Sequence, residues 1–239
     1  MEMRKLVFIL VLLGAGCNKE VDVEDILTDF KVTPETIAAD GKSTIDVSVQ
    51  LNKNASSDRR SVIFKTTSGT FTTSGKSEQT VKATYVDGEL IATAKLRAPI
   101  SNGNFEVTVE PEFNSPIKTY SIRKQVTTSP STLSKIVAES SATGIAANAG
   151  TEVKITGTLL NESGKWVSKN TAVEFVDMVG SAGGGGIFRN SSTLSNDTST
   201  VSTFYSAGNH PAGTVISITV KAKDSNVASD PIKLVVITQ

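Results

Sequence analysis

The chain of 239 residues is long enough for one large domain or for two domains of about 100 residues each. It has 24 Lys and Arg residues against 24 Asp and Glu residues, so no overall charge draws it to nucleic acid, which we exclude as a partner. Aromatic residues make up only 5% of the chain, which argues against a surface that stacks bases or sugars. Thr, Ser and Val recur throughout, and this composition favours β-strands over helices.

The first 16 residues have the pattern of a signal peptide. Arg4-Lys5 forms a short positive region, the apolar run Leu6–Leu13 follows, and the small residues Gly14–Gly16 end the segment. The apolar run is too short to remain in a bilayer as a spanning helix. We therefore predict that residues 1–16 are a signal peptide.

Cys17, the only cysteine of the chain, comes directly after this segment, and a single cysteine cannot form a disulfide within the chain. Its position resembles the lipobox of bacterial lipoproteins, although that family usually has Leu three residues before the cysteine, where this chain has Gly14. The resemblance implies that the chain is cut before Cys17 and that acyl chains such as palmitate are attached to it. Two or three acyl chains hold a protein stably in a membrane. The alternative is an ordinary secretory signal followed by a chance cysteine.

Residues 17–25 are predicted to be the tether between the lipid and the first domain. Lys19 and Glu20, followed by further acidic residues, resemble the surface-export signal of lipoproteins in Bacteroidota-type envelopes. The resemblance implies a lipid-anchored protein of the bacterial outer membrane that is exposed at the cell surface. The alternative is that these charges only keep the tether solvated. The acidic residues from Asp22 to Asp29 match the spacing of no calcium loop, so we expect no metal site.

The chain then repeats itself with a period near 110 residues, which predicts two copies of one domain. Five segments of the first copy recur in the same order in the second. The matching pairs are Ile37–Gly41 with Ile145–Gly150, Ser43–Leu51 with Glu152–Leu160, Val62–Phe64 with Val173–Phe175, Gly69–Phe71 with Gly186–Phe188, and Phe105–Val109 with Ile216–Val220.

Each copy contains about seven short strands, a number typical of an antiparallel sandwich. In the first copy we predict strands at Ile26–Val32, Ser43–Leu51, Ser61–Thr67, Gln79–Tyr85, Glu89–Leu96, Asn104–Glu110 and Ile117–Val126. Val86-Asp87-Gly88 predicts a hairpin turn, because Gly accepts a positive φ. We place the first domain at 26–127, a linker at 128–132, and the second domain at 133–239.

The repeated motifs resemble the bacterial Ig-like domains of invasin- and intimin-type adhesins. Asp40-Gly41, Val62–Phe64, Gly69–Phe71, Asp87-Gly88 and Val107–Val109 fit that family's pattern in the first copy. The second copy has a clear hairpin at Asn161–Gly164, but only Ser195–Thr198 where an Asp-x-Gly turn is expected, and the first has Asn54–Asp58 in place of the Gly hairpin. The resemblance implies an all-β fold of two tandem antiparallel Ig-like β-sandwich domains. Every one of its motifs is structural.

Residues that could perform chemistry are few. His210 is the only histidine and precedes Pro211, which is more typical of a turn than of a base or a metal ligand. Together with Trp166, it is our candidate ligand-binding residue. The run Gly183–Gly186 lacks the Lys-Ser/Thr of a phosphate loop, so we predict a flexible connection between strands. We therefore expect a non-enzymatic protein without a cofactor.

Trp166 follows a hairpin turn, and an exposed Trp can anchor a sugar ring or a protein partner. The alternative is a Trp that caps one end of the sandwich core. We predict a membrane-anchored surface lipoprotein whose tandem domains serve in adhesion or binding of an unidentified protein or glycan, or as a spacer. Its contact surface is predicted at the loops Gly180–Gly186 and Ala207–Gly213, since sandwich domains bind through end loops. The alternative is a glycan-binding accessory of a carbohydrate-uptake system.

Overall fold

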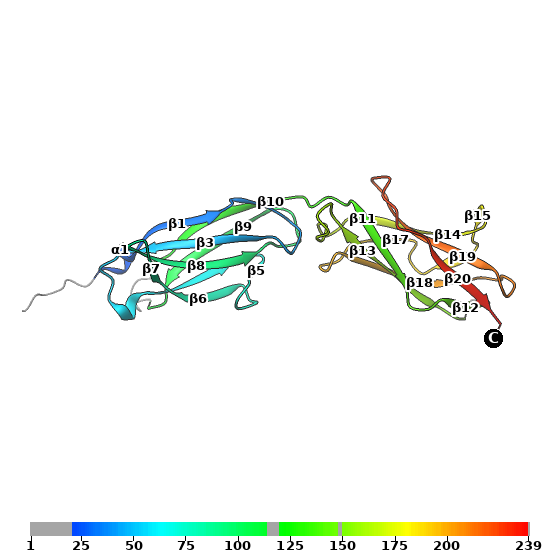
Figure 1. Cartoon of the computed structure of the whole chain (residues 1–239), viewed down its shortest axis with the longest axis horizontal. Helices are drawn as coiled ribbons and strands as arrows, with labels where there is room; N and C mark the ends of the chain where they lie inside the picture. Colours follow the sequence, from blue (N-terminus) through cyan, green and yellow to red (C-terminus); the bar gives the residue numbers. More distant parts are fainter. Residues whose placement is uncertain (1–20, 114–119, 148–149, 239) are drawn as a thin grey trace, which may run out of the picture.

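The computed structural model describes residues 21–113, 120–147 and 150–238, which form two sandwich domains arranged end to end (Figure 1). Cys17, Lys19 and Glu20 lie outside the described residues, as does the predicted signal peptide. Within the described ranges, no helix is long and apolar enough to cross a membrane.

The first domain consists of two sheets. One sheet has the strand order β1 (Leu27–Thr33), β3 (Thr44–Leu51), β8 (Glu89–Arg97) and β5 (Thr70–Phe71), with β7 (Thr84–Val86) also paired to β8. The other has the order β2 (Thr36–Ala38), β10 (Ile122–Ser129), β9 (Asn104–Pro111), β4 (Ser61–Thr66) and β6 (Glu78–Lys82). All pairings are antiparallel except β2 with β10. The chain enters through the short helix α1 (Val23–Ile26), and the 3-10 helix η1 (Ser57–Arg59) joins β3 to β4.

The second domain repeats this topology with two differences: its first sheet lacks a counterpart of β7, and its second sheet has one additional strand. One sheet has the order β11 (Lys135–Ser140), β13 (Val153–Leu160), β18 (Thr200–Ser206) and β16 (Ile187–Phe188). The other has the order β12 (Gly144–Ala146), β20 (Ile232–Ile237), β19 (Val215–Ala222), β14 (Ala172–Val179) and β15 (Ala182–Gly183), with β17 (Ser192–Leu194) also paired to β14. All five predicted segment pairs overlap matching strands of the two domains, which confirms the internal repeat.

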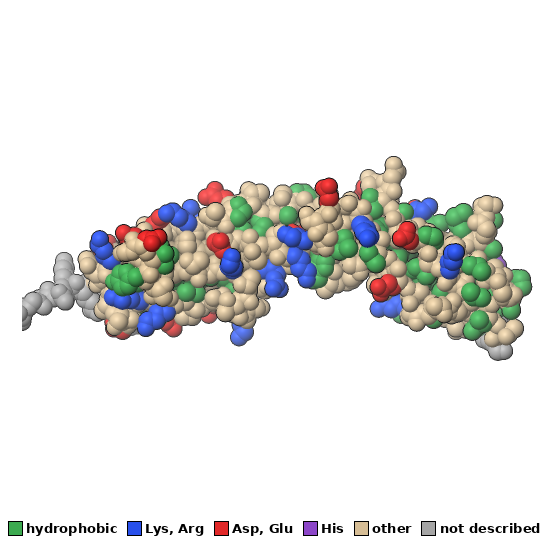
Figure 2. Space-filling view, viewed as in Figure 1, with side chains coloured by type: hydrophobic (Ala, Val, Ile, Leu, Met, Phe, Trp, Pro, Cys, Tyr) green, Lys and Arg blue, Asp and Glu red, His purple; other side chains and the backbone are tan. Residues whose placement is uncertain are grey.

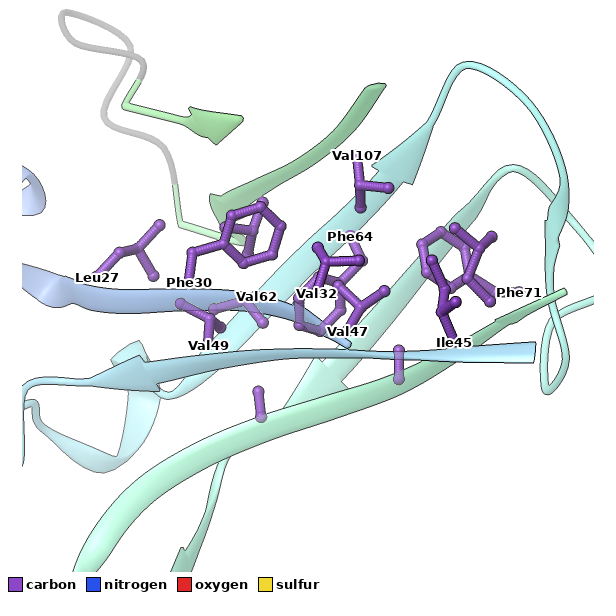
Figure 3. Packing of buried hydrophobic residues seen from close by; sticks show 14 of the residues in the cluster. Leu27, Phe30, Val32, Ile45, Val47, Val49, Val62, Phe64, Phe71 and Val107 are labelled. Atoms are coloured by element: carbon purple, nitrogen blue, oxygen red, sulfur yellow. The ribbon is translucent and has the colours of Figure 1, made fainter. Parts of the chain in front are cut away.

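Alternation along the strands places the cores between the sheets. In β3 the burial alternates from Ile45 to Leu51, because successive side chains of a strand point to opposite faces. Phe64 lies at the centre of the first core, with its ring 6.5 Å from Phe30 and 6.3 Å from Phe71 (Figure 3). Each such buried side chain contributes about 1.5–3 kcal/mol to stability. In the second core Phe188 lies 4.7 Å from Tyr205.

Two predicted boundaries differ from the structure. Residues 128 and 129, placed in the linker, belong to β10, because Thr128 is buried and pairs with Ile37 of β2. The end of the predicted tether forms the helix α1, because the fully buried side chain of Ile26 draws the chain onto the core. The hairpin turn at Asp87-Gly88 is confirmed, with φ of 51° and 84°.

Candidate binding surface at the C-terminal tip

The loops 180–186 and 207–213 lie together at the end of the second domain that is farthest from the first domain, and we call them the C-terminal tip (Figure 1). Neither loop contains Lys, Arg, Asp or Glu. Figure 2 shows this end of the molecule as apolar and uncharged, whereas acidic and basic side chains are spread over the rest of the visible face. The tip therefore exposes mainly small side chains and backbone groups.

His210 joins the two loops. Its Nε2 contacts the carbonyl oxygen of Gly184, and because a carbonyl only accepts, Nε2 carries the proton and donates it. Gly208 lies against the same loop, where an added Cβ would be 2.8 Å from the carbonyl oxygen of Gly185. The only histidine thus supports the shape of the tip, which agrees with its interpretation as a turn residue.

Asp177, near the end of β14, accepts hydrogen bonds from the glycine-rich loop. Its Oδ2 accepts hydrogen bonds from the Tyr205 hydroxyl at 2.8 Å and from the Gly186 amide at 2.9 Å, and its backbone carbonyl accepts from Gly184 at 3.1 Å. Burial raises the pKa of Tyr205, and the bond to the Asp177 carboxylate raises it further. The hydroxyl therefore stays protonated and keeps donating to Asp177.

The run Gly183–Gly186, predicted as a flexible connection, is closely packed at two of its glycines. Gly184 and Gly186 pack closely against side chains, so that an added Cβ would lie 2.3 Å from Asp177 Oδ2 and 2.1 Å from the Tyr205 hydroxyl oxygen respectively. The glycines allow this close approach. Asp177 and Tyr205 therefore contact the loop directly and limit the space open to Gly184 and Gly186.

Trp166, predicted as a candidate ligand anchor, lies at the joint between the domains. The Lys42 ammonium lies 3.7 Å from the centre of its ring, and Gly41 packs against the ring edge. Next to it, Lys165 Nζ donates to Ser43 Oγ at 2.8 Å and lies 3.8 Å from Asp40 Oδ2. The indole is half-buried by the first domain, which leaves less of it for a ligand.

Two further contacts complete the joint. Ser168 Oγ donates to the carbonyl of Ala39 at 3.1 Å, and the Lys169 amide donates to the carbonyl of Ile100 at 3.0 Å. The hairpin loop after β13 therefore docks on two loops of the first domain. This loop is three residues longer than its counterpart, because Leu159 and Val173 are 14 positions apart whereas Leu51 and Val62 are 11 apart.

No protein-family model matches the chain, and no curated protein matches its sequence. The crystal structure of invasin, a bacterial integrin-binding protein, is similar over 89% of this chain, with a TM-score of 0.55 and 20% identity. The chain has the invasin-type Ig-like fold. It spans 39% of the invasin chain, so what invasin binds remains a property of that protein.

Two other adhesin structures are similar over 89% of the chain. The adhesin InvE of Yersinia pseudotuberculosis is 16% identical, with a TM-score of 0.43 and 60% of its own chain covered. The D0–D1 domain of intimin is 17% identical, with a TM-score of 0.35 and 99% of its chain covered. Because both TM-scores are below 0.5, the fold assignment depends on invasin.

The two invasin-type domains differ most at the tip. Phe175 and Phe188 are 13 positions apart, whereas the equivalent Phe64 and Phe71 are seven apart, so the glycine-rich connection is six residues longer. The connection that contains His210 is two residues longer than its counterpart, which joins β8 to β9.

Sequence reasoning missed Asp177 and Tyr205. Both lie in strands where the polar group occupies an inward position of the alternation, and this is the signal that could have revealed them. Among the described residues, no three His, Cys, Asp or Glu side chains are grouped to hold a metal ion.

Proposed function

We propose that this chain is a non-enzymatic lipoprotein, anchored through Cys17 in the bacterial outer membrane, whose second domain presents the C-terminal tip to a protein partner. Lys19 and Glu20 support its exposure at the cell surface. The long axis of the molecule supports this arrangement, since α1 and the C-terminal tip lie at opposite ends (Figure 1). The first domain then serves as the spacer.

One observation carries the proposal: the extra residues of two loops are placed together at the tip and held in a defined shape. A connection that only joins strands does not need six additional residues, as the first domain shows. Long loops between sheet ends are commonly binding elements, because the scaffold positions them rigidly. The absence of charge in both loops favours a partner surface that is itself uncharged.

A loop graft from the same chain tests the tip. Residues 179–186 are replaced by residues 68 and 69, which make the equivalent short connection in the first domain, so that Met178 is kept. Cells that display the full chain are measured for attachment to a panel of immobilised proteins and to other cells. We expect attachment that depends on the chain and that the graft abolishes, with unchanged surface level and circular dichroism. Unchanged attachment by the graft variant would contradict the role of the tip.

The anchor is tested separately. Intact cells are treated with protease and compared between the wild type and Cys17→Ala. We expect the wild type to be in the membrane fraction and to be cleaved from outside, and the variant to be lost from the cell surface. A variant that stays at the surface in equal amount would contradict lipid anchoring through Cys17.

A glycan-binding role has weaker support, because the Trp166 ring is covered by Lys42 and Gly41 of the first domain. Exposed aromatic rings are the usual platform for sugar rings. Glycan-array binding that is lost on Trp166→Ala would restore this alternative.

A further inference from the structure

The outer face of the second domain's larger sheet carries apolar side chains close to the tip. Val215 and Val235 face each other across β19 and β20, with exposed fractions of 44% and 41%. Met178 on β14 is 39% exposed and Ile237 on β20 is 50% exposed, and the half-buried Val176 continues the row on β14. We call these five residues the lateral patch.

The repeat provides an internal comparison for this patch. Phe105 pairs with Val126 in the first domain as Ile216 pairs with Leu234 in the second, and Phe64 pairs with Val109 as Phe175 pairs with Val220. These registers fix the equivalent positions. Val176, Met178, Val215, Val235 and Ile237 correspond to Lys65, Thr67, Asn104, Thr127 and Ser129.

All five positions are polar in the first domain and apolar in the second. The fold therefore does not require apolar side chains there, since the first domain forms the same sheet without them. Charged pairs lie on the same face of the first domain, between Lys65 and Glu110 and, at 3.6 Å, between Arg123 and Glu106. Of the ten large apolar side chains exposed among the described residues, eight belong to the second domain. A cluster of this kind indicates a contact surface.

The charges around the patch indicate what it contacts. On the same face Glu174 and Lys221 lie directly opposite each other on β14 and β19, so their charges offset one another, and Lys233 lies at the side. The five side chains of the patch are uncharged. Such a surface is complementary to a second copy of itself, because a two-fold axis brings the same apolar side chains together and buries no charge of the patch.

The proposed anchor, on which this inference rests, brings such copies together. Asp22 is only five residues beyond Cys17, a stretch that spans at most about 18 Å. The lateral patches of neighbouring copies are then held at similar heights above the bilayer. Confinement to one membrane also raises their effective concentration.

We propose that the lateral patch is an interface between two copies of this chain, which pair side by side through their second domains in the membrane. The two tips of a pair then point the same way, with their loops free of the interface. Two tips that bind together give higher avidity than one, without any new contact. Pairing thus deepens the proposed role in binding.

A single introduced thiol tests the interface, because Cys17 is the only cysteine and is blocked when it is acylated. Ser217→Cys places a thiol on the outer face beside Val215, opposite Met178. Glu106→Cys places it at the equivalent position of the first domain and is the matched control. With a short bismaleimide and membranes that contain the full chain, we expect at least about tenfold more cross-linked dimer from Ser217→Cys.

Adding Val215→Asn and Val235→Thr, which copy the first domain, must remove this dimer, whereas Val137→Thr on the other sheet must not. Equal yields from both thiols, or a dimer that survives the double substitution, overturn the proposal. If Cys17→Ala shows that the chain is not anchored, both thiols are compared in that background at rising protein concentration. A dimer specific to Ser217→Cys then still supports the interface, and equal yields still overturn it.

Discussion

Trp166 of the second domain packs against Gly41 of the first so closely that a Cβ on Gly41 would lie 2.9 Å from Cε3 of the indole. Gly41 also has a φ of 62°, which side chains rarely adopt. One glycine therefore meets two requirements, the tight turn after Asp40 and the close approach of the neighbouring domain. The position of the second domain relative to the first depends on this contact.

Gly41→Ala is expected to push Trp166 out of the joint. Both the left-handed backbone and the contact with the ring oppose a side chain here. Gly88→Ala is the matched control, because Gly88 has a φ of 84° and no atom within 4 Å of an added Cβ. The positive φ is expected to lower the free energy of unfolding of each variant by roughly 1 kcal/mol. Only Gly41→Ala is expected to shift the fluorescence of Trp166, the single Trp, and to change the small-angle scattering profile. Identical fluorescence spectra for the two variants would contradict the contact between Gly41 and Trp166.

Asp40→Ala is expected to destabilise the first domain by about 1–3 kcal/mol. The buried carboxylate accepts hydrogen bonds from the Lys42 and Ser43 amides at 2.8 and 2.6 Å and from Ser43 Oγ at 2.6 Å. Asp40→Asn keeps one acceptor oxygen and should cost less. Lys165→Met removes a partly exposed charge 3.8 Å from Asp40 Oδ2 and a hydrogen bond to Ser43 Oγ, but none of the amide bonds of Asp40, so we expect less than about 1 kcal/mol. Urea denaturation that gives equal losses for Asp40→Ala and Lys165→Met would show that the amide bonds contribute little.

Much of the fold could be predicted from sequence because the alternation of buried and exposed residues is regular in the long strands. Ile45 to Leu51 shows it clearly, and β3 begins and ends within one residue of its predicted bounds. The short strands could not be predicted this way. Strands such as β5 and β16 contain two residues each, too few for a period to be visible, and only the Gly-x-Phe repeat indicated them.

The position of the candidate site could be predicted from sequence, but the shape of its loops could not. End loops of a sandwich are adjacent in any such fold, so the pairing of 180–186 with 207–213 follows from topology. The shape of the loops depends on Asp177 and Tyr205, whose contact spans 28 positions and leaves no local pattern. The role of Trp166 depends on where another domain lies, which no pattern within its own hairpin encodes.

Gly186→Ala is expected to destabilise the second domain by about 1–3 kcal/mol, because its Cβ would lie 2.1 Å from the hydroxyl oxygen of the buried Tyr205. Gly183→Ala in the same run of glycines is the control, since no atom lies within 4 Å of the added carbon. Thermal unfolding of the two variants compares them directly. Equal melting temperatures would mean that the loop moves aside at no cost and is not held by Asp177 and Tyr205.

Tyr205→Phe is expected to alter how stability depends on pH. The phenol has an ordinary pKa of 10.0, and burial together with Asp177 raises it in the folded chain. Above about pH 10 the unfolded chain loses this proton while the folded chain keeps it, so the free energy of unfolding falls by up to about 1.4 kcal/mol per pH unit. Below that pH the wild type should be more stable than the variant by about 1 kcal/mol, through the bond to Asp177.

Urea denaturation of wild type and Tyr205→Phe from about pH 8 to about pH 11 should therefore show the stability advantage of the wild type shrinking as the pH rises. Tyr85→Phe, which removes an exposed hydroxyl, is the control. A constant difference between wild type and Tyr205→Phe over that range would mean that the raised pKa of Tyr205 is not linked to folding.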